Sequence, residues 1–127
     1  MLREIAAVRQ HPGEPRRRWF SDERMDLIVW LDRRGAIVAF QLCYDRDHGE
    51  HAVTWQRGAG SRHDAVDDGE HPGRHKATPI LVADGPFPAH RVRRELARRG
   101  RELDADLLAF VLARVAPGRA PPDEPGP

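Results

Sequence analysis

Apolar and polar residues alternate with a period of two over most of the chain, which predicts strands. The signal is clearest at residues 25–31 and 36–44. Between them, Asp32-Arg-Arg-Gly35 supplies a turn-opening Asp and a Gly able to adopt positive φ, so a β-hairpin is expected. Both faces of 36–44 are largely apolar, and this predicts a central strand covered on both sides.

Weaker signals predict four further strands, at residues 2–9, 50–57, 61–66 and 78–83. The connections between the predicted strands are short, so neighbouring strands should pair in antiparallel fashion. A segment rich in Gly, Pro and charged residues, 67–75, is expected to be a loop.

Apolar residues recur at helical spacing only near the end of the chain, where two helices are expected. The first begins near Pro88 and ends at Gly100, with Val92 and Leu96 on its buried stripe. The second begins after Asp104, a good N-cap residue. Its buried stripe is Leu107, Leu108, Val111, Leu112 and Val115.

Together these elements predict an α+β fold: an antiparallel, meandering sheet of about five to seven strands with two C-terminal helices packed on one face. We assign residues 1–116 to a single α+β domain. Residues 117–127 contain five Pro and no large apolar residue, so we expect a disordered Pro-rich tail. No apolar run approaches the ~20 residues of a membrane span, and no secretion signal is evident. A soluble, cytoplasmic protein without a membrane partner is therefore expected.

Charge is balanced overall but segregated along the chain. The 127 residues carry 21 basic and 20 acidic side chains, whereas residues 21–84 alone have 8 basic and 12 acidic ones. Arg clusters occur in the first predicted helix and at Arg16–Arg18, beside Trp19 and Phe20. Arg and aromatic residues together suit nucleic acid, but such binders usually show a domain-wide basic excess. We expect the Arg helix to pair within the fold or across a dimer, and no nucleic-acid partner.

Side chains capable of catalysis gather in the middle of the sequence. An imidazole and carboxylates for acid–base chemistry are offered by His63, Asp67, Asp68 and Glu70. A metal site would instead use His48, His51 and His63. The carboxylates fall in the predicted loop and His48 in a turn, where Asp and Gly occur for backbone reasons. The primary expectation is therefore a non-enzymatic protein with no metal and no cofactor, and no catalytic residue is assigned. Cys43, in mid-strand, is expected to be an inert thiol.

Candidate binding residues lie elsewhere. Trp30 and Gln41 belong to the mixed face of the predicted sheet, Trp55 lies on a nearby strand, and Arg94 and Arg98 lie on the first helix. From these we expect a small non-enzymatic ligand-binding or protein-interaction domain that forms a homodimer. The alternative is a small metal-dependent or His/carboxylate acid–base enzyme that uses residues 63–70. Convergence of two His with a carboxylate would favour the alternative.

Several sequence phrases resemble a group of small bacterial proteins described only as hypothetical. They are Trp19-Phe-Ser-Asp22, Asp26-Leu-Ile-Val-Trp30, Phe40-Gln-Leu-Cys-Tyr-Asp45, Thr54-Trp55, Val66-Asp-Asp-Gly-Glu70 and Thr78-Pro-Ile-Leu-Val-Ala-Asp-Gly85. The resemblance covers about residues 16–90 and leaves out the Arg-rich helix and the tail. It implies a bacterial source and one compact domain, and it carries over no activity, cofactor or catalytic residue.

Overall fold

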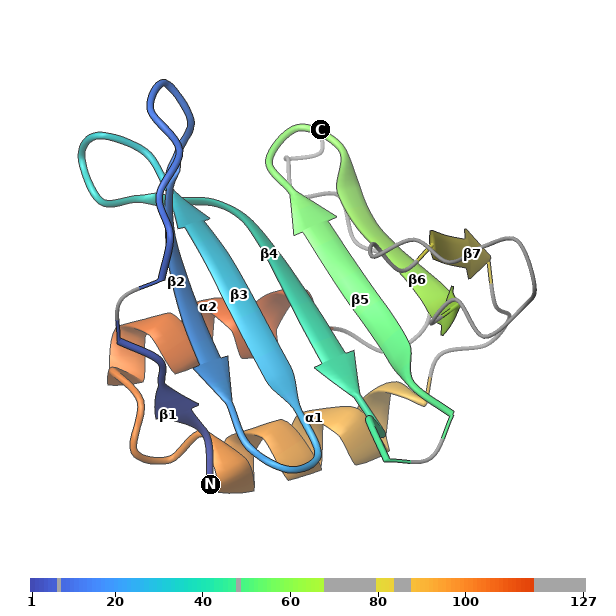
Figure 1. Ribbon diagram of the computed structural model, residues 1–127. Coiled ribbons are helices and arrows are strands. Elements are labelled where there is room, and N and C mark those ends of the chain that lie inside the picture. Colours follow the sequence, from blue (N-terminus) through green and yellow to red (C-terminus); the bar gives the residue numbers. More distant parts are fainter. Residues whose placement is uncertain (7, 48, 68–79, 84–87, 116–127) are drawn as a thin grey trace.

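Seven strands form one antiparallel sheet whose spatial order follows the chain, and two helices come after them (Figure 1). The computed structural model describes residues 1–6, 8–47, 49–67, 80–83 and 88–115. The strands are β1 (Arg3–Glu4), β2 (Arg16–Ser21), β3 (Asp26–Leu31), β4 (Ile37–Tyr44), β5 (His51–Gln56), β6 (Gly60–Asp67) and β7 (Ile80–Ala83).

Helices α1 (Ala89–Arg99) and α2 (Ala105–Arg114) lie on the same face of this sheet, behind the strands in Figure 1. This arrangement confirms the predicted α+β fold, with a meandering sheet and two C-terminal helices. Neither helix is long and apolar enough to cross a membrane.

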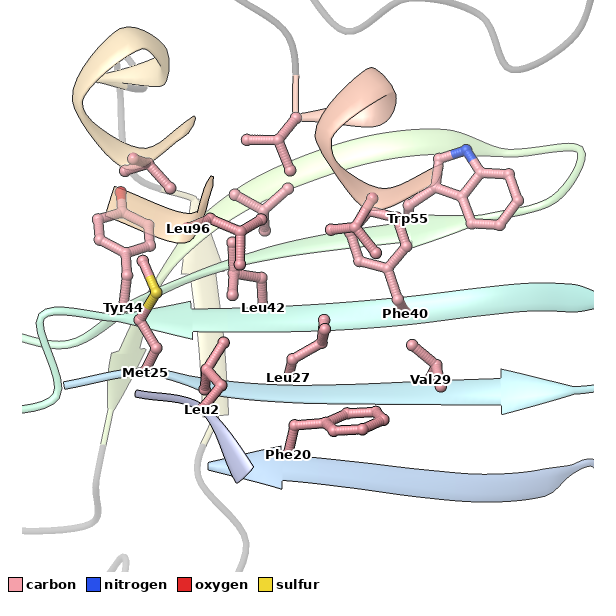
Figure 2. Packing of buried hydrophobic residues seen from close by; sticks show 14 of the residues in the cluster. Leu2, Phe20, Met25, Leu27, Val29, Phe40, Leu42, Tyr44, Trp55 and Leu96 are labelled. Atoms are coloured by element: carbon pink, nitrogen blue, oxygen red, sulfur yellow. The ribbon is translucent and has the colours of Figure 1, made fainter. Parts of the chain in front are cut away.

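A single hydrophobic core fills the space between the sheet and the helices (Figure 2). Alternate residues of the central strands point into it because successive side chains of a strand face opposite ways. Its fully buried members on the strands include Leu27, Val29, Phe40 and Leu42. The helical part of the chain contributes Val92, Leu96, Leu107, Val111 and Val115, as predicted, whereas Leu108 and Leu112 of the predicted stripe are only partly buried against this cluster.

The helix boundaries follow from local chemistry. Asp104 caps α2, its side chain accepting a hydrogen bond from the backbone N–H of Asp106 at 3.2 Å. Gly100 ends α1 and donates its N–H to the carbonyl of Leu96 at 2.8 Å. A Cβ at Gly100 would lie 2.9 Å from that oxygen and 3.0 Å from Leu108 Cδ1, so the close approach of the two helices requires glycine here. The predicted end of α1 and the predicted start of α2 are thus confirmed.

The predicted β3–β4 hairpin is confirmed as well. Gly35 has φ of 87°, a conformation that costs glycine little. The Asp32 carboxylate accepts hydrogen bonds from the N–H groups of Arg34 and Ala36, at 2.9 and 3.0 Å. The turn is therefore held by the residues that predicted it.

The N-terminal part differs from the prediction. Strand β1 has two residues rather than the eight of the predicted segment 2–9. The Ile5 N–H still donates to the Trp19 carbonyl at 2.8 Å, but at Arg17 the side chain of Gln10 takes the place of backbone pairing. Its amide nitrogen donates to the carbonyl of Arg17 at 2.9 Å, and its amide oxygen accepts from the Arg17 N–H at 2.8 Å. Strand β2 was not predicted at all. It places Arg17 on one face of the sheet and Arg16 and Arg18 on the other.

The covering of β4 differs from the prediction, and the predicted loop and tail are almost entirely outside the described residues. The described elements cover only one face of β4, not both as its composition predicts. The loop at 67–75, apart from the backbone of Asp67, and the tail at 117–127 lie outside the described residues.

Candidate functional site

No described helix or strand packs on the sheet face that points away from the helices (Figure 1). One cross-strand row on this face runs Trp19, Ile28, Gln41, Thr54 through β2 to β5, and Trp30 pairs with Ala39 in the next row. All of these side chains are half-buried. We call this surface the open face, composed of Trp19, Ile28, Trp30, Ala39, Gln41 and Thr54.

Charges of both signs border the open face. Asp26 accepts a hydrogen bond from the Trp19 indole N–H at 3.3 Å and forms an ion pair with Arg46 at 3.2 Å. Arg46 also lies 3.9 Å from Glu50. Cys43, opposite Asp26 in the register, is mostly buried, and this burial, with the nearby carboxylates of Glu50 and Asp26, raises the pKa of its thiol to about 12. Because the thiolate is the reactive form, Cys43 lacks the character of a nucleophile.

On the opposite, helix-covered face, three rings gather where β4, β5 and β6 lie side by side. Tyr44 pairs with His51 in the register, and His63 lies opposite Val53 on the next strand. The ring centroids of Tyr44 and His51 are 5.6 Å apart, those of His51 and His63 5.6 Å, and those of Tyr44 and His63 6.0 Å. The Tyr44 hydroxyl lies 2.5 Å from His63 Nε2, a short hydrogen bond. We call these three residues the Tyr–His cluster.

A phenol in hydrogen-bond contact with an imidazole can pass a proton, which is the basic requirement of acid–base chemistry. Arg91 of α1 lies above the Tyr44 ring, 5.8 Å from its centroid, and binds Asp45 through two hydrogen bonds of 3.1 and 2.9 Å. That contact with Arg91 lowers the pKa of Asp45 despite partial burial. An ionised carboxylate and a guanidinium therefore adjoin the Tyr–His cluster.

An ion-pair network links the β2–β3 turn to α1. Arg24 donates to Asp45 at 3.0 Å and to Glu95 at 2.9 Å, and Arg99 donates to Glu95 and Asp22, each at 2.9 Å. These three carboxylates are nearly buried, with side-chain exposures of 14%, 11% and 3% for Asp45, Glu95 and Asp22. The expected pairing of the Arg helix with acidic residues within the fold is thus confirmed for Arg91 and Arg99.

Asp22 is the most enclosed member of this network. Burial by itself would raise the pKa of Asp22, but hydrogen bonds from the Arg24 N–H, the Arg99 guanidinium and the Met25 N–H outweigh it and lower the pKa to about 2. The same contact with Asp22 raises the pKa of Arg99. Asp22 and Arg99 therefore form an ionised pair at neutral pH.

The structure separates the residues predicted as binding groups. Trp30 and Gln41 lie on the open face as expected. Trp55 lies on the other face, 3% exposed, where it stacks on Phe40 at 5.7 Å and meets Phe110 edge-on at 5.2 Å. Trp55 therefore belongs to the core and shares no surface with Trp30. Arg94 and Arg98 are exposed on α1, on the helix side of the molecule.

Of the residues in the acid–base and metal alternatives, His51 and His63 come together, and Tyr44 joins them. His48, Asp68, Glu70 and the side chain of Asp67 lie outside the described residues. Within the part of the chain that is described, no three His, Cys, Asp or Glu side chains are placed to hold a metal ion. Tyr44 is not among the site residues predicted from the sequence, although its partner in the β4–β5 hairpin is His51. The Tyr44–His51 pairing follows from the register of the β4–β5 hairpin, and counting back from the Asp45–Gly49 turn would have indicated it.

Comparison with protein-family models, curated proteins and solved structures found no match for this chain.

Proposed function

We propose that the protein is a non-enzymatic interaction domain of the bacterial cytoplasm that forms a homodimer through its open face. The observation that carries this proposal is the half-buried apolar group Trp19, Ile28 and Trp30 on a sheet face over which no other described element packs. An antiparallel sheet with one face on the core and one in water normally shows polar residues on the outer face. Two Trp and one Ile in adjacent rows are the reverse of that pattern, and such apolar patches mark interaction sites.

The composition of the open face resembles an interface centre with its rim. Aromatic residues are enriched and charged residues depleted at interface centres, whereas the rim is polar. Gln41 and Thr54 follow Ile28 in the same cross-strand row and make its far end polar. Their side chains are in contact at 3.5 Å. The charged groups, Asp26 and Arg46 among them, stand outside this row.

Charge balance favours a second copy of the chain as the partner. The outward sides of β2 to β6 and the adjoining turn carry three Arg (Arg17, Arg46, Arg62) and three carboxylates (Asp26, Glu50, Asp64). Asp64 is fully buried and neutralises Arg62 through an ion pair of 2.7 Å. A twofold interface places the same surface on both sides, so a surface of one sign would repel its copy. A face with balanced charges and an apolar centre has no such penalty.

Sedimentation velocity tests the proposal, with a dimer expected at twice the 14.4 kDa of the chain. Ile28→Lys places a charge at the centre of the open face and should yield the monomer. Ala109→Lys adds the same charge on the exposed side of α2 and should leave the dimer intact. A monomeric wild-type protein, or a dimer that tolerates Ile28→Lys, would refute the proposal. Gln41→Arg provides a second variant of the same face should Ile28→Lys fail to fold by circular dichroism.

The Tyr–His cluster supports acid–base catalysis as a second candidate function. Its specific observation is the 2.5 Å contact between the Tyr44 hydroxyl and His63 Nε2 beside the Asp45–Arg91 pair. Turnover of chromogenic esters and phosphoesters should then depend on His63 and Tyr44. The activity should be lost in His63→Gln and Tyr44→Phe but kept in His90→Gln, which alters an exposed histidine of α1. Absence of turnover, or equal turnover in all variants, would remove this candidate.

A further inference from the structure

Helix α1 and the β2–β3 turn enclose a shallow groove of about 360 Å³ with a strongly basic lining. Five of its six lining residues are arginines: Arg24, Arg91, Arg94, Arg98 and Arg99. The sixth is Glu95, which is nearly buried. We call this surface the arginine groove. Its volume lies within the range of small-molecule sites, about 300–1,000 Å³.

The charges of the groove are layered. The carboxylates that bind its arginines lie beneath them, Asp22, Asp45 and Glu95 being at most 14% exposed. The guanidiniums lie above, with Arg24 and Arg91 at 32% and 46% side-chain exposure. A ligand approaching from solvent therefore meets positive charge first.

The buried carboxylates also orient the guanidiniums. Arg24, Arg91 and Arg99 each make hydrogen bonds of 2.9 to 3.1 Å to them, which limits their rotation before any ligand arrives. Binding to side chains that are already ordered costs less conformational entropy. Arg94 and Arg98 differ from these three because neither has a carboxylate partner among the described residues, so both are available to bind an anion.

Spacing along the helix indicates the size of that anion. Arg91, Arg94 and Arg98 follow one side of α1 at intervals of three and four residues, over a length of about 10 Å. Guanidinium groups bind phosphate oxygens in bidentate fashion, with more specificity than lysine provides. A row of this length matches two or three linked phosphates. We propose that the arginine groove binds a small molecule that carries a di- or triphosphate group.

The surroundings of the groove favour a small phosphate compound over a polynucleotide. Two exposed carboxylates border it: Glu23 lies 3.4 Å from Arg99 and Asp47 lies 3.7 Å from Arg24. A nucleic-acid backbone places a charge at every nucleotide and extends beyond the site in both directions, so it would meet these negative groups. A short phosphate chain ends before them.

Isothermal titration calorimetry with inorganic pyrophosphate and with ATP tests the proposal on the full chain at low ionic strength. Because two charge-assisted contacts are removed, the double variant Arg94→Gln/Arg98→Gln should bind both at least tenfold more weakly. The matched control, Arg33→Gln/Arg34→Gln, removes two exposed arginines from the β3–β4 turn and should bind as the wild type does. A single-stranded oligonucleotide forms the third titration.

Binding of pyrophosphate or ATP that is lost in the groove variant and kept in the control would support the proposal. Absence of binding to both would overturn it, as would equal weakening in the two double variants, which indicates unspecific attraction of anions. Binding of the oligonucleotide without either small phosphate would assign the groove to polynucleotides and overturn it as well. Since the groove and the open face lie on opposite layers, none of these results depends on the homodimer.

Discussion

Replacing Asp22 with Asn removes one charge from the ion-pair network and keeps the shape of the side chain. Asp22 accepts hydrogen bonds from the backbone N–H groups of Arg24 and Met25, at 2.8 and 2.9 Å, and from the Arg99 guanidinium at 2.9 Å. The amino group of Met1 lies 3.0 Å from the same carboxylate. Asn retains an oxygen that can accept from the backbone but offers no charge to Arg99. Asp22→Asn therefore isolates the electrostatic part of the interaction.

The low pKa of Asp22 fixes the magnitude and the pH range of this effect. Its pKa falls from 3.8 to about 2 on folding. Each pKa unit corresponds to about 1.4 kcal/mol, so the charged form stabilises the folded protein by about 2 kcal/mol. Because the folded-state pKa is depressed, this stabilisation is complete above pH 3.8 and is lost as the pH falls through about 2. We expect Asp22→Asn to lower the free energy of unfolding by about 2 kcal/mol at pH 7, and by about half as much at pH 3.

Urea denaturation followed by circular dichroism measures the free energy of unfolding of both proteins at pH 7, 5, 4 and 3. The difference between wild type and Asp22→Asn should be constant from pH 7 to 5 and should shrink below pH 4. Glu23→Gln serves as the control, because Glu23 also contacts Arg99 but is 75% exposed, so its substitution should change stability little at any pH. A difference as large at pH 3 as at pH 7 would refute the electrostatic reasoning and indicate lost packing instead.

Three further predictions concern the core, the second helix and the thiol. Trp55→Ala should cost roughly 3–5 kcal/mol of unfolding free energy in urea denaturation, because it removes a large side chain that packs against Phe40 and Phe110; a cost near zero would contradict a core role. Asp104→Ala should cost about 1 kcal/mol by the same assay, since it removes the N-cap of α2, whereas Glu102→Ala, in the turn before it, should be neutral. Burial raises the pKa of the Cys43 thiol to about 12, so Cys43 should not react with a disulfide reagent in the native protein at pH 8. In urea it should react fully. Rapid reaction of the native protein would show that burial does not protect the thiol.

Local patterns predicted the elements that depend on local chemistry. The β3–β4 hairpin follows from Asp32 and Gly35, and the limits of α1 and α2 follow from Gly100 and Asp104. Strand β2 was not predicted because Arg18 occupies a core-side position, where the alternation of a strand calls for an apolar residue. Arg18 fills that position by laying its guanidinium over the Phe20 ring, 5.1 Å from the centroid, and by pairing with Glu4 at 2.8 Å. The charge is thus neutralised at the sheet edge in a way that only the folded chain reveals.

The candidate sites depend on pairing between residues far apart in the chain, so they are harder to predict from the sequence. The Tyr–His cluster needs the registers of two successive hairpins, β4–β5 and β5–β6, before His63 reaches Tyr44. The network around Glu95 joins this residue to Arg24, which lies 71 positions earlier in the chain. No pattern within a single helix distinguishes Glu95 from an ordinary exposed glutamate. The open face, by contrast, was predictable through Trp30 and Gln41, because alternation along a strand places both without tertiary information.

The outer surface of the helices and the open face of the sheet differ in charge, and this difference favours different partners for the two surfaces. Outside the helices, Arg91, Arg94 and Arg98 present one sign of charge, and two copies of such a surface repel each other. Outside the sheet, the apolar residues are bordered by ion pairs such as Asp26–Arg46 that are already internally balanced. In the proposed homodimer, a second copy of the chain would gain most by covering the sheet, and the arginine groove would then face solvent in both protomers. If the open face forms the dimer, phosphate binding should be equal in the wild-type dimer and in the Ile28→Lys monomer, with one ligand per chain in each.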